Sequence, residues 1–563
     1  MIVPELRPWR AARPHVVRAA DAVRPRLARA AGAVRPRLAR VAAATQPRVA
    51  RLAQAAKPQL ARVTGPKAGR SWQYTAGAAT AGLALAVGVA TAAGPWDSTG
   101  QRTAERDRAV ALERTGGADH GRGDDTSVTA GGSGSSGAAG GAPKPAPSAA
   151  AVLAGLGGPT TKIRSGPEAT ALARVLGPLL ADPALGTRRS AAVLDVTTGK
   201  RLFGSGSDQA LTPASTTKIA TAVAVLAALG PDHRIATRTA LEPGTDEVVL
   251  VGGGDPTLTA RAEADGWASL RTLAATTAAA LKKRGVTHAT LSYDTTLYAG
   301  TEVHPIGVDG NLARVTPLTA DEGRSDDSTS GAVTRVPDPA ADAAKKFAGF
   351  LRAHGVTASA PGPSKATSRA KTLATVSSPP LAALVERMLT NSDNDIAEAL
   401  ARQTALATGV RPDFAGGAKA VRTQLGRLGL PLAGADFRDG SGLDREGRLT
   451  ADLLTALLAK AADPDRPDLR AALTGLPVAG FTGTLSERYA ATAPGADTVT
   501  GAAGVVRAKT GTLTGVNSLA GTVVDRDGHL LAFALLASGT TDRTAAQSAL
   551  DRAAGALAAC GCR

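Results

Sequence analysis

The chain has 563 residues, which is more than one ordinary domain contains and enough for two or three. Its charge is uneven: residues 1–73 hold 16 basic and two acidic side chains, a net charge of +14, whereas the remaining residues carry only +3. A near-neutral main part with 3% aromatic residues excludes a dedicated nucleic-acid-binding protein, and two cysteines confined to the last four residues, Cys560 and Cys562, exclude a disulfide-rich scaffold or a cysteine-bound metal cluster.

Residues 1–73 contain a repeat of 11 residues marked by proline, at Pro14, Pro25, Pro36, Pro47 and Pro58. Eleven residues are close to three helical turns, so the repeat predicts short helices with proline in each first turn. The alternative is a disordered arm rich in Ala, Pro and Arg. We expect this tail to lie in the cytoplasm against anionic lipid, with a cytoplasmic protein or nucleic acid as the alternative partner.

Residues 74–96 follow as a stretch without charge, composed mostly of Ala, Gly, Val, Leu and Thr. Twenty such residues can span a bilayer, and the arginine-rich side is expected to stay inside the cell. The pattern predicts a single-pass signal-anchor in the cell membrane, with everything after it on the cell-wall side. A cleaved signal peptide is the alternative, but its charged region is normally much shorter than 73 residues.

Residues 97–159 are rich in Gly, Ser and Pro and predict a disordered linker. Residues 160–559 mix strand and helix periods, which predicts an α/β sheet domain with inserted material at about 240–375, before a short tail at 560–563. We expect strands at 190–195, 247–251, 505–508, 519–524 and 530–536. We expect helices at 218–229, 267–284, 340–354, 380–388, 395–407, 415–428, 450–462 and 543–558.

The first chemical motif is Ser215-Thr216-Thr217-Lys218, which is followed by a helical apolar run. Residues three apart share one face of a helix, so the lysine amine can reach the serine hydroxyl and accept its proton. The chain contains a second copy, Ser368-Arg369-Ala370-Lys371, in a loop that leads into a strand rather than a helix. We interpret that copy as a coincidence.

Two further motifs follow in order. Ser392-Asp393-Asn394 lies between two helical segments, where a simple helix cap is the alternative interpretation. Lys509-Thr510-Gly511-Thr512 lies at the end of the expected strand 505–508, where a hairpin turn is the alternative. The combination of the three motifs, 177 and 117 residues apart, is typical of penicillin-binding proteins and class A β-lactamases.

The sequence resembles the penicillin-recognising serine D-alanyl-D-alanine carboxypeptidases, of the carboxypeptidase/endopeptidase type with a large insert between the first two motifs. The resemblance covers roughly residues 160–555, and the insert is short for this type. It rests also on Val251-Gly252-Gly253-Gly254-Asp255-Pro256-Thr257-Leu258, Asp439-Gly440-Ser441-Gly442-Leu443, Leu476-Pro477-Val478-Ala479-Gly480 and Gly483-Thr484-Leu485. It implies a β-lactamase/transpeptidase-like α/β fold, with an antiparallel sheet flanked by helices, a helical subdomain and an inserted domain.

The resemblance also implies a role for each motif residue. Ser215 attacks the bond between two D-alanines of a peptidoglycan stem peptide, Lys218 takes its proton, and Ser392 relays a proton to the leaving amine. Asn394 holds the substrate amide, while Lys509 and Thr510 bind the substrate carboxylate. The backbone N–H groups of Ser215 and Thr512 hold the oxyanion. Penicillin is expected to acylate Ser215 and to leave slowly.

One role follows from the residue itself: Gly511 is expected to leave room for a substrate strand laid along this edge. No cofactor or metal is expected, because the seven histidines are scattered without a helical metal-binding pair. Three functions remain open: a carboxypeptidase or endopeptidase that trims peptidoglycan peptides, a β-lactamase, and a non-enzymatic module that kept the fold. The intact motifs favour the first.

Overall fold

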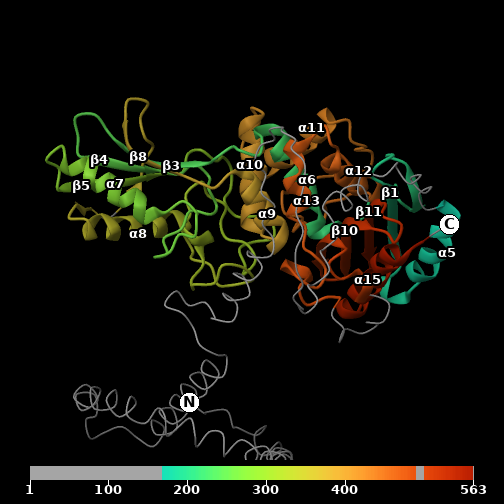
Figure 1. Ribbon diagram of the computed structural model, residues 1–563. Helices are drawn as coiled ribbons and strands as arrows, with labels where there is room; N and C mark the ends of the chain where they lie inside the picture. Colours follow the sequence, from blue (N-terminus) through green and yellow to red (C-terminus); the bar gives the residue numbers. More distant parts are fainter. Residues whose placement is uncertain (1–167, 360, 490–499, 562–563) are drawn as a thin grey trace, which may run out of the picture. The chain divides into compact units, whose positions relative to one another are not determined.

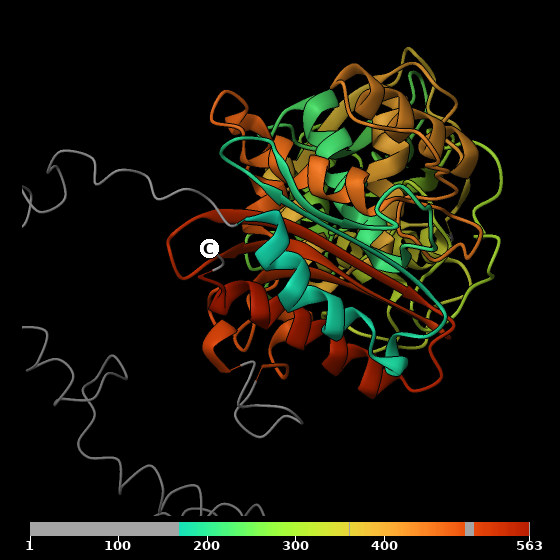
Figure 2. The same ribbon diagram turned by 90° about the vertical axis from the view of Figure 1, so that its right-hand side faces the viewer.

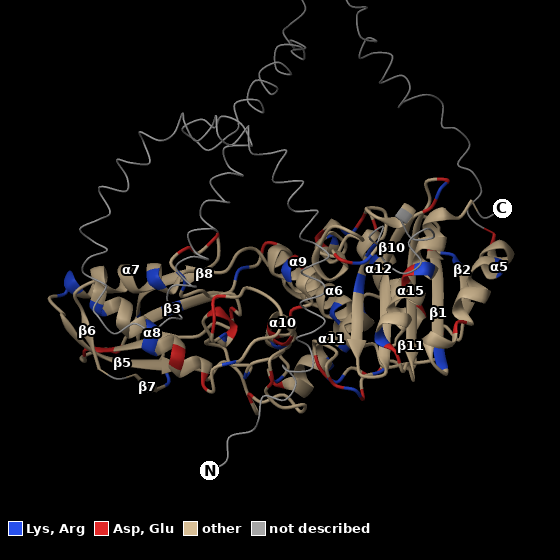
Figure 3. Ribbon diagram, turned by 90° about the horizontal axis from the view of Figure 1, so that it is seen from below, with Lys and Arg blue, Asp and Glu red and all other residues tan. Residues whose placement is uncertain are grey.

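The computed structural model describes residues 168–359, 361–489 and 500–561 (Figure 1). The predicted basic repeat, signal-anchor and linker lie outside these residues and stay predictions. Within the described part of the chain, no helix is both long and apolar enough to cross a membrane. Acidic and basic segments are interspersed along the described ribbon (Figure 3).

The main sheet has five antiparallel strands in the order β2-β1-β11-β10-β9. They are β1 (Arg188–Asp195), β2 (Arg201–Ser205), β9 (Arg507–Leu513), β10 (Val516–Val524) and β11 (Leu530–Ser538). Strands from the two ends of this region therefore pair with each other, as the clustering of predicted strands at both ends indicates. The third motif lies on β9, which is an edge strand of this sheet.

Side chains alternate between the two faces of the main sheet, and each face has its own apolar core. Ala192 and its cross-strand partner Ala534 belong to the core formed with the central helices. Val193 and its partner Phe533 belong to the core formed with α5 (Ala169–Leu180) and α15 (Arg543–Ala559). Figure 2 shows α5 and α15 together on one side of the sheet.

The opposite face carries the helical part of the molecule. Its helices are α6 (Thr217–Leu229), α9 (Leu381–Asn391), α10 (Asn394–Ala407), α11 (Phe414–Arg427), α12 (Ala451–Ala462) and the short α13 (Ala471–Thr474). Helix α6 is buried on every side from Thr217 to Leu226, which explains why its sequence is apolar almost throughout instead of amphipathic. The helix that carries Lys218 is therefore the centre of the core.

Between the first two motifs the chain forms a second, mixed sheet, whose six main strands and covering helices run from Ala236 to Ser377; we call residues 236–377 the inserted unit. Its elements are β3 (Ala236–Leu241), β4 (Glu247–Val251), α7 (Leu270–Lys282), β5 (His288–Asp294), α8 (Pro339–Ala353), β6 (Thr357–Ala358), β7 (Gly362–Pro363) and β8 (Lys371–Ser377). The inserted unit has its own apolar core under α7 and α8. The range of about 240–375, where the sequence predicts an insert, lies within these residues.

Short 3₁₀ turns complete the fold: η1 (Pro183–Leu185), η2 (Ala214–Thr216), η3 (Asp321–Gly323), η4 (Pro467–Leu469), η5 (Gly483–Leu485) and η6 (Thr500–Ala502). Strands β2, β3, β5, β6 and β7 and helices α5 and α13 were not predicted, whereas a strand was expected after the second serine–lysine copy, where β8 begins. Strand β3 shows why, because its buried positions include Thr237 and Thr239, so the strand lacks an apolar alternation. The Thr239 hydroxyl is satisfied by that of Thr277 on α7, a contact that only the folded chain provides.

Candidate active site

A cavity of about 600 Å³ brings the three motifs together. Five of the predicted site residues line it: Ser215, Ser392, Asn394, Thr510 and Thr512. Lys218 and Lys509 are both fully buried behind its wall. Segments that are 177 and 117 residues apart in the sequence therefore meet around one serine hydroxyl.

Ser215 lies in the 3₁₀ turn η2, and Lys218 lies in the first turn of α6 that continues from it. The lysine Nζ is 3.0 Å from the serine Oγ. This is the contact predicted from a spacing of three residues on a helix.

The Lys218 amine has two further acceptors, the Asn394 side-chain oxygen at 2.6 Å and the Ser441 carbonyl at 2.8 Å. A neutral amine has two N–H bonds and one lone pair, so donation to these two acceptors leaves the lone pair for the Ser215 hydroxyl. Burial lowers the pKa of Lys218 to about 8, although the negative charges of Asp439 and Glu398 act to raise it. Lys218 is thus built as a base that can accept the serine proton near neutral pH.

The backbone before the nucleophile is strained and closely packed. Ala214 has a positive φ of 49°, a conformation that L residues with a side chain rarely adopt. A Cβ on Gly442 would lie 1.9 Å from the Ala214 carbonyl oxygen, and a Cβ on Gly511 would lie 2.6 Å from that of Pro213. Two segments that are distant in the sequence therefore pack closely against this turn, and each needs a glycine at the point of contact.

The structure gives a reason for glycine at position 511 that was not predicted. Its missing Cβ would point toward the Ser518 hydroxyl, at 2.1 Å, and toward Pro213. Glycine is required there because β9 packs against the turn that carries Ser215, and the room for a substrate strand stays a prediction.

The second motif combines a helix cap with site residues. Asp393 caps α10 by accepting the N–H of Ile396, as the cap interpretation predicts. Ser392 ends α9 in the left-handed conformation, with φ 58°, and its hydroxyl has no hydrogen-bond partner among the described residues. The Asn394 amide donates to the Asn311 carbonyl at 3.0 Å, so this residue joins the lysine to the inserted unit.

The third motif is part of a strand, which contradicts both the predicted strand end at residue 508 and the hairpin alternative. Strand β9 continues to Leu513 and pairs Lys509 with Ala520 and Thr512 with Asn517 on β10. The polar residues of the motif do not have the sequence pattern of a buried strand. Lys509 is buried only because distant parts of the chain pack around it.

The side chains of the third motif have partners that the sequence did not indicate. The Lys509 amine donates to the Thr510 carbonyl, and burial together with the charge of Lys218 holds the pKa of Lys509 well below its usual range. The Thr510 hydroxyl bonds that of Thr484 at 2.8 Å, and the Thr512 hydroxyl accepts from Gln547. The second copy of the serine–lysine motif begins in an exposed turn and ends at Lys371, the first residue of β8, so it leads into a strand as predicted.

Comparison with known proteins identifies the family. A model of the D-Ala-D-Ala carboxypeptidase 3 (S13) family matches residues 172–306 and 322–559. The chain belongs to this family.

Curated relatives and a solved structure agree with this assignment. The carboxypeptidase is 36% identical over 429 residues to a carboxypeptidase of Mycobacterium tuberculosis, a match that covers 75% of this chain and 90% of the relative. It is 37% identical to the carboxypeptidase DacB of Mycolicibacterium smegmatis, over 70% of this chain and 85% of that one. Penicillin-binding protein 4 of Haemophilus influenzae shares the fold, with a TM-score of 0.54 and 21% identity over 68% of this chain and 97% of that one. The resemblance inferred from the motifs is confirmed.

The inserted unit of this S13 carboxypeptidase contributes to the cavity wall, which the sequence analysis did not resolve residue by residue. Asn311, Arg324 and Arg335 line the cavity from the inserted unit, and Arg543 and Gln547 line it from one face of α15. No local pattern marks these residues, because they come from loops of the inserted unit and from α15, which only the folded chain brings together.

Buried charges join the inserted unit to α10. Arg335 of the inserted unit pairs with Asp395 on α10 at 2.9 Å, and within the inserted unit Arg324 pairs with Glu322 at 2.8 Å. Burial and the neighbouring Asp393 raise the pKa of Asp395 to about 7.

Proposed function

We propose that this carboxypeptidase cleaves the D-alanyl-D-alanine bond at the end of peptidoglycan stem peptides through an acyl-enzyme on Ser215. The observation that carries the proposal is the hydrogen bond of 3.0 Å between Ser215 and the buried Lys218 at the wall of the cavity. Relatives named D-alanyl-D-alanine carboxypeptidase, such as that of Actinomadura at 29% identity, support the substrate class.

In the proposed reaction the Ser215 oxygen attacks the carbonyl carbon of the penultimate D-alanine, and its proton passes to Lys218. The backbone N–H groups of Ser215 and Thr512 stabilise the oxyanion. The proton then moves through the Ser392 hydroxyl to the leaving nitrogen, the C–N bond breaks, and the terminal D-alanine departs. Water repeats these steps on the ester and restores Ser215.

The substrate carboxylate is proposed to bind beside Thr510 and Thr512. Gln547 donates to the Thr512 hydroxyl, and Arg543 lies one turn earlier on the same face of α15, so a cation stands near this position. Lys509 is fully buried and does not line the cavity, so its charge can act on the substrate carboxylate only at a distance, without direct contact. Asn394 is proposed to hold Lys218 as its first role and the substrate amide as its second, because its oxygen is already bonded to the amine.

The test is to incubate the full-length protein separately with a pentapeptide ending in D-Ala-D-Ala and with a cross-linked peptide dimer. We expect mass spectrometry to show release of one alanine from the pentapeptide, and cleavage of the dimer if the enzyme is also an endopeptidase. Neither reaction should occur with Ser215→Ala. An unchanged pentapeptide with an active dimer reaction would make the protein an endopeptidase alone.

Benzylpenicillin separates the remaining alternatives. A stable adduct on the native protein that is absent from Ser215→Ala is expected for the carboxypeptidase. Rapid loss of the drug without an adduct would favour a β-lactamase. Neither drug loss nor adduct would favour a binding module.

We propose further that residues 74–96 anchor the protein, with the catalytic region on the cell-wall side and residues 1–73 against anionic lipid. The +14 charge directly before an uncharged stretch supports this arrangement, since each arginine near an anionic surface contributes about 1 kcal/mol. A peptide of residues 1–73 should co-sediment with anionic vesicles and not with neutral ones. Equal binding to both would contradict the lipid proposal.

A further inference from the structure

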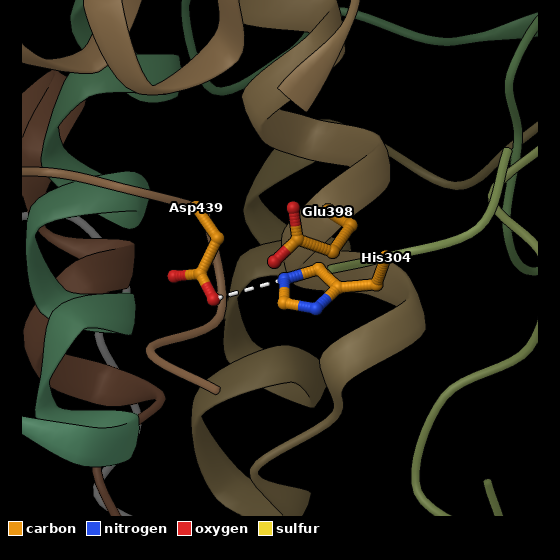
Figure 4. Close-up of side chains that lie close together, drawn as sticks. All are labelled: His304, Glu398 and Asp439. Carbon is orange, nitrogen blue, oxygen red and sulfur yellow. Dashed lines mark hydrogen bonds and ion pairs between the residues drawn. The ribbon is translucent and has the colours of Figure 1, made fainter. Parts of the chain in front are cut away.

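His304 is a buried histidine of the inserted unit that lies behind the catalytic lysine. It is 1% exposed, and its ring packs edge-on against Phe414, with 5.0 Å between ring centroids. Figure 4 shows its ring directed at Asp439, with Glu398 beside both. His304 and these two carboxylates do not line the cavity.

The hydrogen bonds of His304 define which nitrogen carries the proton. Its Nδ1 accepts the backbone N–H of Ile306 at 3.2 Å, so this nitrogen holds a lone pair. The hydrogen of the neutral ring is then on Nε2, which donates to the Asp439 carboxylate at 3.1 Å. His304 is therefore a fixed donor to Asp439.

Asp439 in turn holds the segment that follows it. One carboxylate oxygen accepts the N–H of Gly442, and the other accepts that of Asp444, both at 2.7 Å. Burial raises the pKa of Asp439, but the hydrogen bonds from His304 and the backbone outweigh it and keep the pKa below its ordinary value. Asp439 is thus a charged acceptor at the centre of this turn.

Glu398 on α10 holds the same segment from the other side, by accepting the N–H groups of Gly440 and Ser441. The segment then presents its carbonyls to α6: Gly440 accepts from the Thr221 hydroxyl at 2.6 Å, and Ser441 accepts from the Lys218 amine at 2.8 Å. Any shift of this turn therefore moves an acceptor of the catalytic amine.

His304, Glu398 and Asp439 also have the composition of a metal site, with ligand atoms within 4.8 Å of one another. Their ligand atoms are already used, however: Nε2 donates to Asp439, and both carboxylates accept backbone N–H groups. The hydrogen bonds therefore explain, without invoking a metal, why these three residues lie together: they support the turn at residues 440–444.

We propose that His304 is a positioning residue for Lys218. Its Nε2–H orients Asp439, Asp439 and Glu398 hold residues 440–444, and the Ser441 carbonyl fixes the amine beside Ser215. The inserted unit would then support the catalytic base as well as lining the cavity. This inference rests on the proposed role of Lys218 as the base.

The experiment compares His304→Gln and His304→Asn in the full-length protein, because the two amides imitate different ring nitrogens. The glutamine side chain can place an N–H near the position of Nε2 and keep the hydrogen bond to Asp439. The shorter asparagine side chain can replace Nδ1 as the acceptor of the Ile306 N–H, but it does not reach Asp439. Time courses at several benzylpenicillin concentrations separate the acylation rate constant from the binding constant. We expect roughly a 10- to 100-fold lower acylation constant in Asn, unchanged binding, and a value near that of the native protein in Gln.

Phe414→Leu is the control, because it removes the ring contact with His304 and lowers stability while leaving the Nε2–H in place. Its melting temperature should fall without a change in the acylation constant. The proposal is overturned if His304→Asn acylates at the native rate, if the loss lies in binding, or if a folded His304→Gln is as slow as His304→Asn. Because the native protein is measured alongside, failure of the proposed function itself would show as absence of its adduct.

Discussion

Lys218→Met should lower the rate of acylation by benzylpenicillin by roughly 10³-fold or more, because it removes the base that accepts the Ser215 proton. Methionine keeps the length of the apolar stem inside the core and deletes only the amine. In the native protein the neutral amine is the active form and burial lowers the pKa of Lys218 to about 8, so the rate should rise as the pH increases toward 8 and level off above it. Lys218→Met should lack this rise. The measurement is adduct formation by intact mass, followed with time at several pH values.

Lys371→Met is the matched control, since Lys371 is the exposed lysine of the second serine–lysine copy. It should acylate as the native protein does, with the same pH dependence. A Lys218→Met protein that is folded and retains the native rate and pH profile would show that another group accepts the serine proton.

Gly442→Ala should impair the site by displacing the backbone that carries the nucleophile. The new Cβ would lie 1.9 Å from the Ala214 carbonyl oxygen, and the residue would keep a positive φ of 80°. A collision with backbone cannot be relieved by a side-chain rotation, so residues 213–215 or 440–443 must move. We expect roughly 100-fold slower acylation, because a shift of about 1 Å at the nucleophile costs that much, and a loss of unfolding free energy of about 2–4 kcal/mol.

Gly409→Ala provides the comparison for backbone strain alone. Gly409 has a similar φ of 69°, but no atom lies within 4 Å of the position of its Cβ. This variant should lose about 1–2 kcal/mol of unfolding free energy and keep the native acylation rate. Equal acylation rates in Gly442→Ala and Gly409→Ala would show that the two turns can separate without moving Ser215.

The elements with strong local patterns were predictable. Helices α6, α8 and α10 and strands β4, β10 and β11 were expected close to their observed bounds, because their apolar residues form continuous runs or recur at helical spacing, which the local sequence alone shows. Strands such as β3 were missed, because threonine hydroxyls satisfied only by tertiary contacts replace the apolar side chains there.

The sequence by itself determined the nucleophile–lysine pair, the order of the three motifs and, through them, the family. These depend on short-range geometry: Ser215 and Lys218 are three residues apart on a helical turn, so local structure alone places their side chains together. Tertiary structure decided what surrounds the amine. Asn394 and Ser441, its two other acceptors, are 176 and 223 residues away in the chain, and His304 comes from a separate unit. No local period encodes such contacts, because they arise only when buried polar groups from distant segments must satisfy one another.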